Sequence, residues 1–368
     1  MSETLGGEPP SDGFRTLGEL ERAAAQRIPA PQWAYVQGGA EAERALAANR
    51  AAFLRRTLIP RALTDVSRVD PSVSILGSAV SLPYFVAPTA HQEFVHPEGE
   101  LATARAAGEA GVLAAFSTLS GRSLEEIAHA APRSSRWFQL YLQPDFSQSR
   151  ALVERAERAG YRAIVLTVDM PVFAQRDALA EHGFEVYEHA VLGNGPSIAP
   201  PGRSPERGDH GFALGPPAAT TWTIVDDLIS ITRLPVVVKG LLSIEDAERA
   251  VARGAQGIVV SNHGGRQLDA APAALDVLRP IALALGGRAE IYVDGGVRRG
   301  SDIVIALALG ARAVGLGRPV LWALGAGGEA GVRRYFRLLE REFVTALALC
   351  GCRRLSEVDA SLLGPTAP

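Results

Sequence analysis

The stretch GIVVSNHGGRQLD, residues 257–269, joins an apolar strand pattern to a polar loop. Residues 257–260 are apolar without alternation, which is typical of a strand buried on both faces of a parallel sheet. The loop that follows places His263 and Arg266 three residues apart. A histidine can take up a proton near neutral pH, and an arginine can hold a carboxylate by two parallel hydrogen bonds. The stretch therefore predicts a βα unit whose loop can bind an acid and deprotonate it.

Apolar runs of the same kind recur from about residue 83 onward and alternate with helical patterns, which indicates repeated βα units. In one such helical pattern, Ser243 and Asp246 form a capping-box start and Gly254 supplies the end. A doubly wound sheet is the alternative, but its Gly-rich turn would follow the first strand, where Pro88-Thr89-Ala90 stands instead. Eight strands favour a closed (β/α)8 TIM barrel. The predicted strands are Tyr84–Ala87, Val112–Ala115, Trp137–Leu142, Ala163–Val168, Pro235–Lys239, Gly257–Val260, Glu290–Asp294 and Ala313–Leu316.

The segments outside the eight units are interpreted as additions to one barrel domain, residues 16–368. Residues 17–37 have a helical pattern, and residues 73–82 predict a hairpin that turns at Gly77-Ser78. After the fourth strand the pattern lapses, and residues 177–221 are rich in Pro and Gly. A long loop at the catalytic face of a barrel is typical of a lid. Residues 1–15 are polar and rich in Gly and Pro, so we expect a disordered tail and no signal peptide.

The composition is that of an ordinary globular protein, with 47% hydrophobic residues and a net charge of -3 over 368 residues. Basic and acidic residues are interspersed, so we expect no nucleic-acid partner. No apolar stretch is long enough to cross a bilayer, so we expect no membrane partner. The only cysteines, Cys350 and Cys352, suit a reducing cytoplasm. The histidines show no metal-ligand spacing, and no metal site is expected.

Polar residues stand where the predicted strands end, and in a barrel those ends build the active site. Polar residues in apolar strands are costly unless they are paired or used. Glycines and arginines after the last two strands, in residues 294–298 and 315–318, suit close backbone approach and phosphate oxygens. The sequence therefore predicts an active site with a phosphate-bearing ligand. In chain order the strand-end residues are Thr89, Ser117, Gln139, Tyr141, Thr167, Asp169, Lys239, His263, Arg266, Asp294, Gly296, Gly317 and Arg318.

With these segments the chain resembles the FMN-dependent 2-hydroxy acid oxidases and dehydrogenases, a family that includes glycolate oxidase, lactate oxidase, mandelate dehydrogenase and hydroxymandelate oxidase. The resemblance extends from about Leu17 to Leu355. It implies FMN as cofactor, oxidation of an (S)-2-hydroxy acid to a 2-oxo acid, and a homo-oligomer, tetrameric or octameric. The segments that carry it are residues 87–90, 96–100, 138–141, 166–169, 261–269 and 293–299.

The resemblance also implies catalytic roles. His263 would be the base that removes the substrate's proton, with Asp169 paired to the imidazolium that forms. The same base serves whether the electrons leave as a hydride or after a carbanion forms. Tyr141 would hydrogen-bond the substrate hydroxyl, and Lys239 would stabilise the reduced flavin by its positive charge. Bond breaking at the α-carbon needs a base, a bound carboxylate and an electron sink, so the residue chemistry agrees with these roles.

The binding residues implied by the resemblance form two groups. Arg266 and Arg176, assisted by Tyr35, would hold the substrate carboxylate. The implied FMN contacts are Thr89, Ala90, Ser117, Gln139, Thr167, Lys239, Ser261, Asp294, Gly296, Arg298, Gly317 and Arg318.

Two residues depart from the family pattern. Leu119 stands where short-chain glycolate oxidases carry a tryptophan, which leaves room for a larger substrate side chain, such as the aryl group of mandelate. Phe173 would add to the apolar wall. His91 stands where many relatives carry an apolar residue, and the sequence leaves open whether it lines the pocket or points outward.

Three function classes fit the sequence. The first is the flavin-dependent oxidation, with dioxygen giving hydrogen peroxide or, as in a dehydrogenase, with another acceptor. The second is a different FMN-binding or phosphate-binding barrel enzyme, such as an isomerase or a nucleotide dehydrogenase. A nucleotide dehydrogenase would need a cysteine in a rim loop, and Cys350 and Cys352 lie beyond the last strand. The third is a catalytically silent barrel, against which the retained base, carboxylate and arginines argue.

Overall fold

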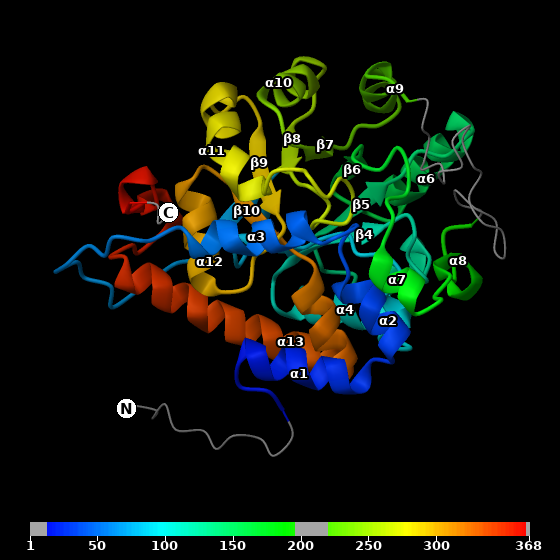
Figure 1. Cartoon of the computed structure of the whole chain (residues 1–368). Helices are drawn as coiled ribbons and strands as arrows, with labels where there is room; N and C mark the ends of the chain where they lie inside the picture. The colour runs from blue at the N-terminus through cyan, green and yellow to red at the C-terminus, as the bar shows by residue number, and fades with distance from the viewer. Residues whose placement is uncertain (1–12, 196–219, 366–368) are drawn as a thin grey trace.

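The computed structural model describes residues 13–195 and 220–365, and its centre is a closed barrel of eight parallel strands (Figure 1). The strands follow the order β10-β3-β4-β5-β6-β7-β8-β9 around the barrel. The predicted (β/α)8 TIM barrel is therefore confirmed. The barrel strands are β3 (Tyr84–Val86), β4 (Leu113–Ser117), β5 (Arg136–Leu140), β6 (Ile164–Thr167), β7 (Val236–Leu241), β8 (Gly257–Val260), β9 (Glu290–Asp294) and β10 (Ala313–Leu316).

Helices follow the strands and surround the barrel in Figure 1. Ser243 accepts a hydrogen bond from the Asp246 amide at the start of α10, which is the serine half of the expected capping box. The backbone of α13 leaves helical geometry at Gly327 and Gly328, so this helix is kinked. The helices that follow barrel strands are α4 (Gly99–Glu109), α5 (Leu124–Ala130), α6 (Phe146–Arg158), α9 (Thr223–Ser230), α10 (Ile244–Ala252), α11 (Ala274–Leu285), α12 (Gly300–Ala308) and α13 (Arg318–Leu349).

The strands bury side chains on both faces, as their continuous apolar runs predict. Phe85, Trp137 and Tyr292 point into the barrel and contact one another, with ring centroids 5.3 to 5.8 Å apart. Alternate residues such as Tyr84 and Phe138 pack outward against the helices. Because successive side chains of a strand point to opposite faces, one run of residues supplies both cores.

The N-terminal segment, residues 17–37, is helical as predicted and forms two helices before the barrel, α1 (Leu17–Arg27) and α2 (Ala30–Gln37). The two helices are separate because Pro29 holds Ile28 in an extended conformation, with ψ 128°. The following α3 (Arg44–Leu54) was not predicted. In Figure 1, α1 lies along α13, and the two helices contact each other.

The predicted hairpin is confirmed as β1 (Val73–Ile75) and β2 (Ser78–Val80). Its turn lies one residue earlier than predicted, at Leu76 and Gly77, which both have positive φ. Ile75 is fully buried in the barrel's interior core, and the Leu76 amide donates to Glu290 at the start of β9. The hairpin therefore closes the end of the barrel opposite the strand C-termini.

The segment predicted as a lid, residues 177–221, is described only in part. Residues 177–195 contain α7 (Asp177–Glu181) and α8 (Val186–His189), whereas 196–219 lie outside the described residues. Most of the expected disordered tail, residues 1–12, lies outside them as well. The helix α7 contacts α2, which places the described part of this segment beside the N-terminal helices. Three short 3-10 helices complete the description: Gln92–Phe94, Leu355–Glu357 and Ala360–Leu362.

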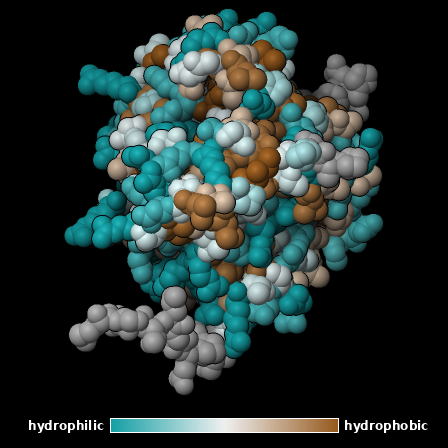
Figure 2. All heavy atoms as spheres, turned by 90° about the vertical axis from the view of Figure 1, so that its left-hand side faces the viewer, coloured by the Kyte–Doolittle hydropathy of each residue, from teal (hydrophilic) through white to brown (hydrophobic). Residues whose placement is uncertain are grey.

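The surface is mixed in polarity. Figure 2 shows one face on which apolar side chains gather near the middle among polar ones. Single exposed apolar side chains are normal on protein surfaces, and Leu54, Ile59 and Leu63 are examples here. Within residues 13–195 and 220–365, no helix has the length and hydrophobicity that spanning a membrane requires.

The close contact between Gly300, at the start of α12, and the backbone of α13 predicts the effect of a substitution on the stability of the protein. A Cβ at Gly300 would lie 2.2 Å from the Phe343 amide nitrogen and 2.3 Å from the Glu342 carbonyl carbon, both in the α13 backbone. Because that backbone cannot yield locally, we expect Gly300→Ala to lower the free energy of unfolding by about 1–3 kcal/mol. Gly18→Ala is the matched control, since its Cβ would meet only the Arg22 guanidinium at 3.5 Å and alanine favours helix. Equal melting temperatures for the two variants would contradict the prediction.

Candidate active site

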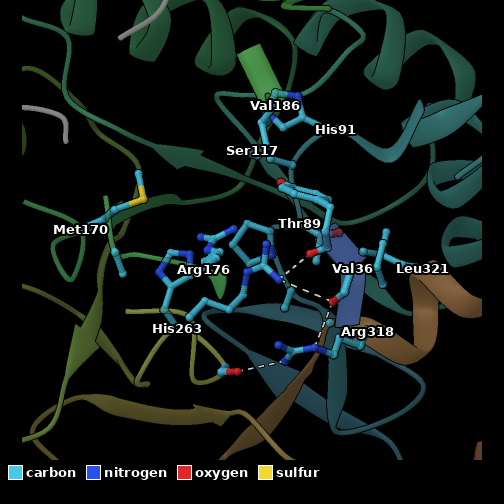
Figure 3. Close-up of a pocket in the computed structure, with 18 of the residues that line it drawn as sticks. Val36, Thr89, His91, Ser117, Met170, Arg176, Val186, His263, Arg318 and Leu321 are labelled. Carbon is cyan, nitrogen blue, oxygen red and sulfur yellow. Dashed lines mark hydrogen bonds between the residues drawn. The ribbon is translucent and has the colours of Figure 1, made fainter. Parts of the chain in front are cut away.

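A cavity of about 790 Å³ opens at the C-terminal ends of the barrel strands. Its lining comes from the turns after β3 and β4, from the loop after β6, and from the glycine-rich turns after β9 and β10. Figure 3 shows His263, Arg176 and Arg318 toward one end of the drawn pocket and His91 and Ser117 toward the other. Most of the predicted site residues therefore line one cavity, whereas Gln139, Thr167, Asp169 and Ser261 lie outside its lining.

His263 and Asp169 form a hydrogen-bonded pair across the barrel rim. His263 Nδ1 lies 2.8 Å from Asp169 Oδ1. The backbone of His263 is left-handed, with φ 58°, and its amide donates to Ser261 Oγ at 3.0 Å, which fixes the turn. A carboxylate on Nδ1 holds the proton on that nitrogen and leaves Nε2 as an acceptor. The pair is therefore arranged for Nε2 to accept a proton from the cavity.

The charges around this pair favour a neutral histidine beside ionised partners. Burial lowers the pKa of His263, and although Asp169 acts in the opposite direction, the net shift is downward. Burial opposes ionisation of Asp169, but His263 and Lys239 outweigh it, and the pKa of Asp169 is lowered. Burial likewise disfavours charge on Lys239, but Asp294 and Asp169 outweigh it and raise its pKa. The histidine is thus ready to accept a proton at neutral pH.

Lys239 lies near the end of β7 and contacts polar residues at the ends of the neighbouring strands. Its Nζ donates to Ser261 Oγ at 3.0 Å and lies 3.5 Å from Asp294 Oδ2 and 3.9 Å from Asp169 Oδ2. Ser261 Oγ donates in turn to Asp294 Oδ1 at 2.6 Å. A buried cation with these partners is satisfied and fixed in position. The network joins the rims of β6, β7, β8 and β9.

The cavity carries an excess of positive charge. Burial, with the nearby charge of Arg176, lowers the pKa of Arg266 to about 9. Burial and the neighbouring arginines lower the pKa of Arg318 as well. Buried cations that depress one another's pKa are stabilised by anions bound between them. Five cationic side chains line the cavity, Arg176, Lys239, Arg266, Arg298 and Arg318, together with two carboxylates, Glu185 and Asp294.

Two of the predicted ligand-binding arginines also anchor the end of α2. Arg266 Nη1 donates to the carbonyl oxygens of Tyr35 at 2.7 Å and Gly38 at 3.0 Å, and its guanidinium lies 5.0 Å from the Tyr35 ring centre. Arg318 donates to the carbonyls of Val36 and Gly38 and to Gly264 beside His263 (Figure 3). Arg318 therefore joins α2 to the histidine loop in addition to contributing charge.

The turns after β9 and β10 carry the residues that the sequence predicts to bind a phosphate. Gly296 has φ 85°, and a Cβ there would lie 2.3 Å from the Asn49 carbonyl oxygen, so only glycine fits. The Arg298 guanidinium lies 4.8 Å from the Trp322 ring centre. Gly317 directly precedes α13, whose N-terminus faces the same turn. A glycine-rich turn at a helix start and buried arginines suit a phosphate group.

The floor of the cavity is a ladder of hydrogen bonds across three strands. Ser117 Oγ donates to Gln139 Oε1 at 2.9 Å, and Gln139 Nε2 donates to Thr167 Oγ1 at 3.0 Å. Ser117, Thr89 and Ala90 line the cavity, whereas Gln139 and Thr167 are buried behind its lining. Ser117, Gln139 and Thr167, all predicted to contact the flavin, are therefore joined in one ladder, of which only Ser117 lines the cavity.

An apolar wall stands on the other side of the cavity. Leu119, Tyr141 and Met170 form a buried cluster against which Ala90, Phe173 and Leu192 pack. The Tyr141 backbone is held by Thr118, whose Oγ1 accepts its amide at 3.0 Å. The predicted roles of Leu119 and Phe173 as apolar lining agree with this placement. Met170 was not predicted, although it follows Asp169 directly in the sequence.

Supporting polar residues also escaped prediction. Asn49 on α3 and Asn262 exchange two side-chain hydrogen bonds, at 2.7 and 3.0 Å, and Asn262 Oδ1 also accepts the Gly265 amide. Asp269 Oδ1 accepts the Ala45 amide at the start of α3. These contacts hold the histidine loop against α3. Asn262 and Asp269 lie inside the stretch 257–269, but their partners are more than 200 residues away in the chain.

Comparison with known proteins finds a matching family and relatives that are similar over nearly the whole chain. A family model described as FMN-dependent dehydrogenase matches residues 24–365. L-lactate oxidase from Nostoc sp. is 46% identical over 354 residues, which cover 94% of this chain and 97% of that protein. Glycolate oxidase 1 from Oryza sativa subsp. indica is 45% identical over 343 residues, which cover 92% and 93%. A solved mandelate oxidase variant with (S)-mandelic acid has a TM-score of 0.86 at 44% identity, with 95% of this chain and 98% of that chain covered.

Proposed function

This chain belongs to the FMN-dependent dehydrogenase family, whose cofactor is FMN, and from that premise we propose that it oxidises an (S)-2-hydroxy acid to the 2-oxo acid with dioxygen as electron acceptor. The observation that carries the proposal is the His263–Asp169 pair at 2.8 Å beside Arg266 in one cavity. A base next to a carboxylate-binding group is what deprotonation of a bound hydroxy acid requires.

The residues of the cavity fit FMN in charge and shape. The buried cations Arg298 and Arg318 need an anion, and the Gly296 turn leaves no room for a side chain. We assign the phosphate to Arg298, Arg318, Gly296 and Gly317, and the flavin ring to Thr89, Ala90, Ser117, Gln139, Thr167 and Lys239. We assign Ser261 and Asp294 to cofactor contacts near Lys239. When bound, FMN supplies the electron sink that no amino-acid side chain provides.

The substrate carboxylate belongs with Arg266 and Arg176. Arg266 donates to backbone carbonyls through Nη1 alone, which leaves its Nη2 edge for a carboxylate, and Tyr35 lies against the guanidinium. Arg176 precedes α7 and lines the same cavity. Two guanidinium groups orient a carboxylate by charge-assisted hydrogen bonds, which also offsets their mutual repulsion.

The proton steps belong to His263 and Tyr141. His263 Nε2, neutral because burial lowers the pKa of the ring, takes the substrate's proton, and Asp169 stabilises the imidazolium that results. Tyr141 is 6% exposed and lines the cavity, where its hydroxyl can hydrogen-bond the substrate oxygen. Asp169 thus lowers the free energy of the charged state that forms during the reaction.

The size of the apolar wall indicates a substrate larger than glycolate. Leu119, Met170 and Phe173 leave an apolar recess that a substrate with no side chain would not fill. Among relatives, mandelate oxidase structures have been solved with aryl compounds such as (S)-mandelic acid and benzoyl-formic acid, and one with the non-aryl 3,3,3-trifluoro-2,2-dihydroxypropanoic acid. We therefore propose an aryl or long alkyl 2-hydroxy acid.

Anaerobic spectroscopy of the purified holoenzyme tests this function. The yellow protein is mixed without oxygen with glycolate, lactate, 2-hydroxyhexanoate or mandelate, each as separate enantiomers, and the loss of flavin absorbance is timed. We expect the (S) forms of the larger acids to bleach the protein fastest, and air to restore the colour with formation of hydrogen peroxide. A preference for glycolate would refute the proposed size, colour that fails to return in air would indicate a non-oxygen acceptor, and no bleaching by any acid would refute the function.

A further inference from the structure

His91 occupies an unusual position in the wall of the cavity. It follows Ala90 directly and has a left-handed backbone, with φ 55°, which histidine adopts more readily than most residues. Its amide donates to the Leu119 carbonyl at 3.3 Å, and its carbonyl accepts the Phe94 amide. These bonds fix the backbone beside the apolar wall. The side chain points inward, where its ring packs against Phe94 and Tyr35.

The imidazole is buried without hydrogen-bond partners among the described residues. His91 is only 3% exposed, and its Nδ1 has no partner, with Glu93 Oε1 at 3.6 Å. The ring stacks on Phe94, with centroids 5.1 Å apart, and lies edge-on to Tyr35. A buried polar ring without partners is costly, and an apolar residue would pack there at lower cost. The His91 imidazole can therefore form hydrogen bonds that no described residue makes with it.

Carboxylates lie behind the imidazole, on the side of Nδ1. Glu93 Oε2 and Glu100 Oε2 are also buried without partners, and burial together with the charge of Glu93 raises the pKa of Glu100 to about 7. A carboxylate near Nδ1 favours the proton on that nitrogen and leaves Nε2 as the acceptor of a neutral ring. Because Nδ1 faces Glu93, the Nε2 edge is the one left for the cavity that His91 lines.

We propose that His91 is a specificity-determining residue that hydrogen-bonds a hydroxyl group on the substrate's side chain. In Figure 3, His91 and His263 lie apart in the drawn pocket, and we place the substrate's side chain in the space toward His91. A hydroxyl can donate to a neutral imidazole and accept from a charged one, so it fits either state. The preferred substrates are therefore hydroxyl-bearing 2-hydroxy acids. This inference rests on the proposed function.

The test compares matched substrates in matched variants of the holoenzyme. The pairs are mandelate against its 2-, 3- and 4-hydroxy forms, and 2-hydroxyhexanoate against 2,6-dihydroxyhexanoate. In the unaltered protein we expect kcat/KM for at least one hydroxylated acid to exceed that of its parent by about tenfold, as one hydrogen bond to a buried partner allows. In His91→Met we expect the hydroxylated acid and its parent to have about the same kcat/KM. His129→Met, the same change at an exposed histidine on α5, should retain it.

A binding measurement covers the case in which His91→Met does not fold or hold flavin. The matching 2-oxo acids are titrated into the unaltered holoenzyme, and their dissociation constants are read from the shift of the visible flavin spectrum. A hydroxylated 2-oxo acid that binds about tenfold tighter than its parent supports the proposal. Equal affinities, or a kcat/KM ratio unchanged by His91→Met, would overturn it. Bleaching by 2-hydroxy acids without a hydroxyl preference refutes this inference alone, whereas no bleaching by any acid refutes the proposed function.

Discussion

Replacing His263 by asparagine is expected to slow anaerobic flavin bleaching by roughly 10²–10⁴-fold, the range that a positioned general base contributes. Asparagine tolerates the left-handed backbone, φ 58°, so the turn should persist, and its amide cannot accept a proton at neutral pH. The loop keeps its other supports, because the bonds of Asn262 and Asp269 to α3 do not involve the imidazole. We therefore expect a yellow protein that binds substrate without reducing its flavin at the normal rate.

The measurement is a stopped-flow bleaching rate at saturating substrate, together with the flavin content. His129→Asn on the exposed face of α5 is the matched control and should bleach as the unaltered protein does. A second check is substrate binding, which should change little because Arg266 and Arg176 remain. A His263→Asn protein that holds flavin and bleaches within twofold of the unaltered rate would remove His263 from the role of base.

Replacing Asp169 by asparagine should reduce the bleaching rate by about 10- to 100-fold and shift the pH dependence. The carboxylate stabilises the imidazolium through a bond of 2.8 Å, and a hydrogen bond to a charged group contributes about 1.5–3 kcal/mol. Asp169 also raises the pKa of His263 against the larger effect of burial, so its removal lowers that pKa further. The base is active only when neutral. The acid limb of kcat/KM should therefore move to lower pH while the plateau falls.

A lower plateau together with an acid limb at lower pH distinguishes electrostatic pairing of Asp169 with His263 from a merely structural role of Asp169. A variant that is only misfolded loses rate at every pH without shifting the limb downward. Asp226→Asn is the matched control, because Asp226 is exposed on α9 and pairs with Arg253 far from the cavity. An acid limb that moves to higher pH in Asp169→Asn would contradict the electrostatic assignment. The profile of kcat/KM is the appropriate measurement because it reports the free enzyme.

Much of the site was predictable because it lies on the strands themselves. Lys239, Asp294 and the stretch 257–269 occupy strand ends, and the ends of parallel strands meet at one rim whatever the helices do. What could not be predicted depends on partners remote in sequence. The carbonyls of α2 that Arg266 and Arg318 hold lie more than 200 residues before them, and no local pattern indicates that contact.

The orientation of His91 shows the same limit. Its sequence position permitted an inward or an outward side chain, and only the packing of Phe94 and Tyr35 around the ring places it in the cavity wall. The helix α3 was missed for a related reason. Its Asn49 is buried and satisfied by Asn262, so a polar residue occupies a core position that a hydrophobic pattern would not assign.

The sequence by itself determined the barrel, the cofactor family and the position of His263, the residue proposed as base. Strands buried on both faces must be apolar throughout. The eight strands can therefore be recognised in the sequence as apolar runs that end in polar residues. The tertiary structure alone decided which backbone carbonyls Arg266 and Arg318 hold, where the N-terminal helices are separated at Pro29, and which edge of His91 faces the cavity. Those features depend on contacts between distant segments, and such contacts leave no periodic signal in the sequence.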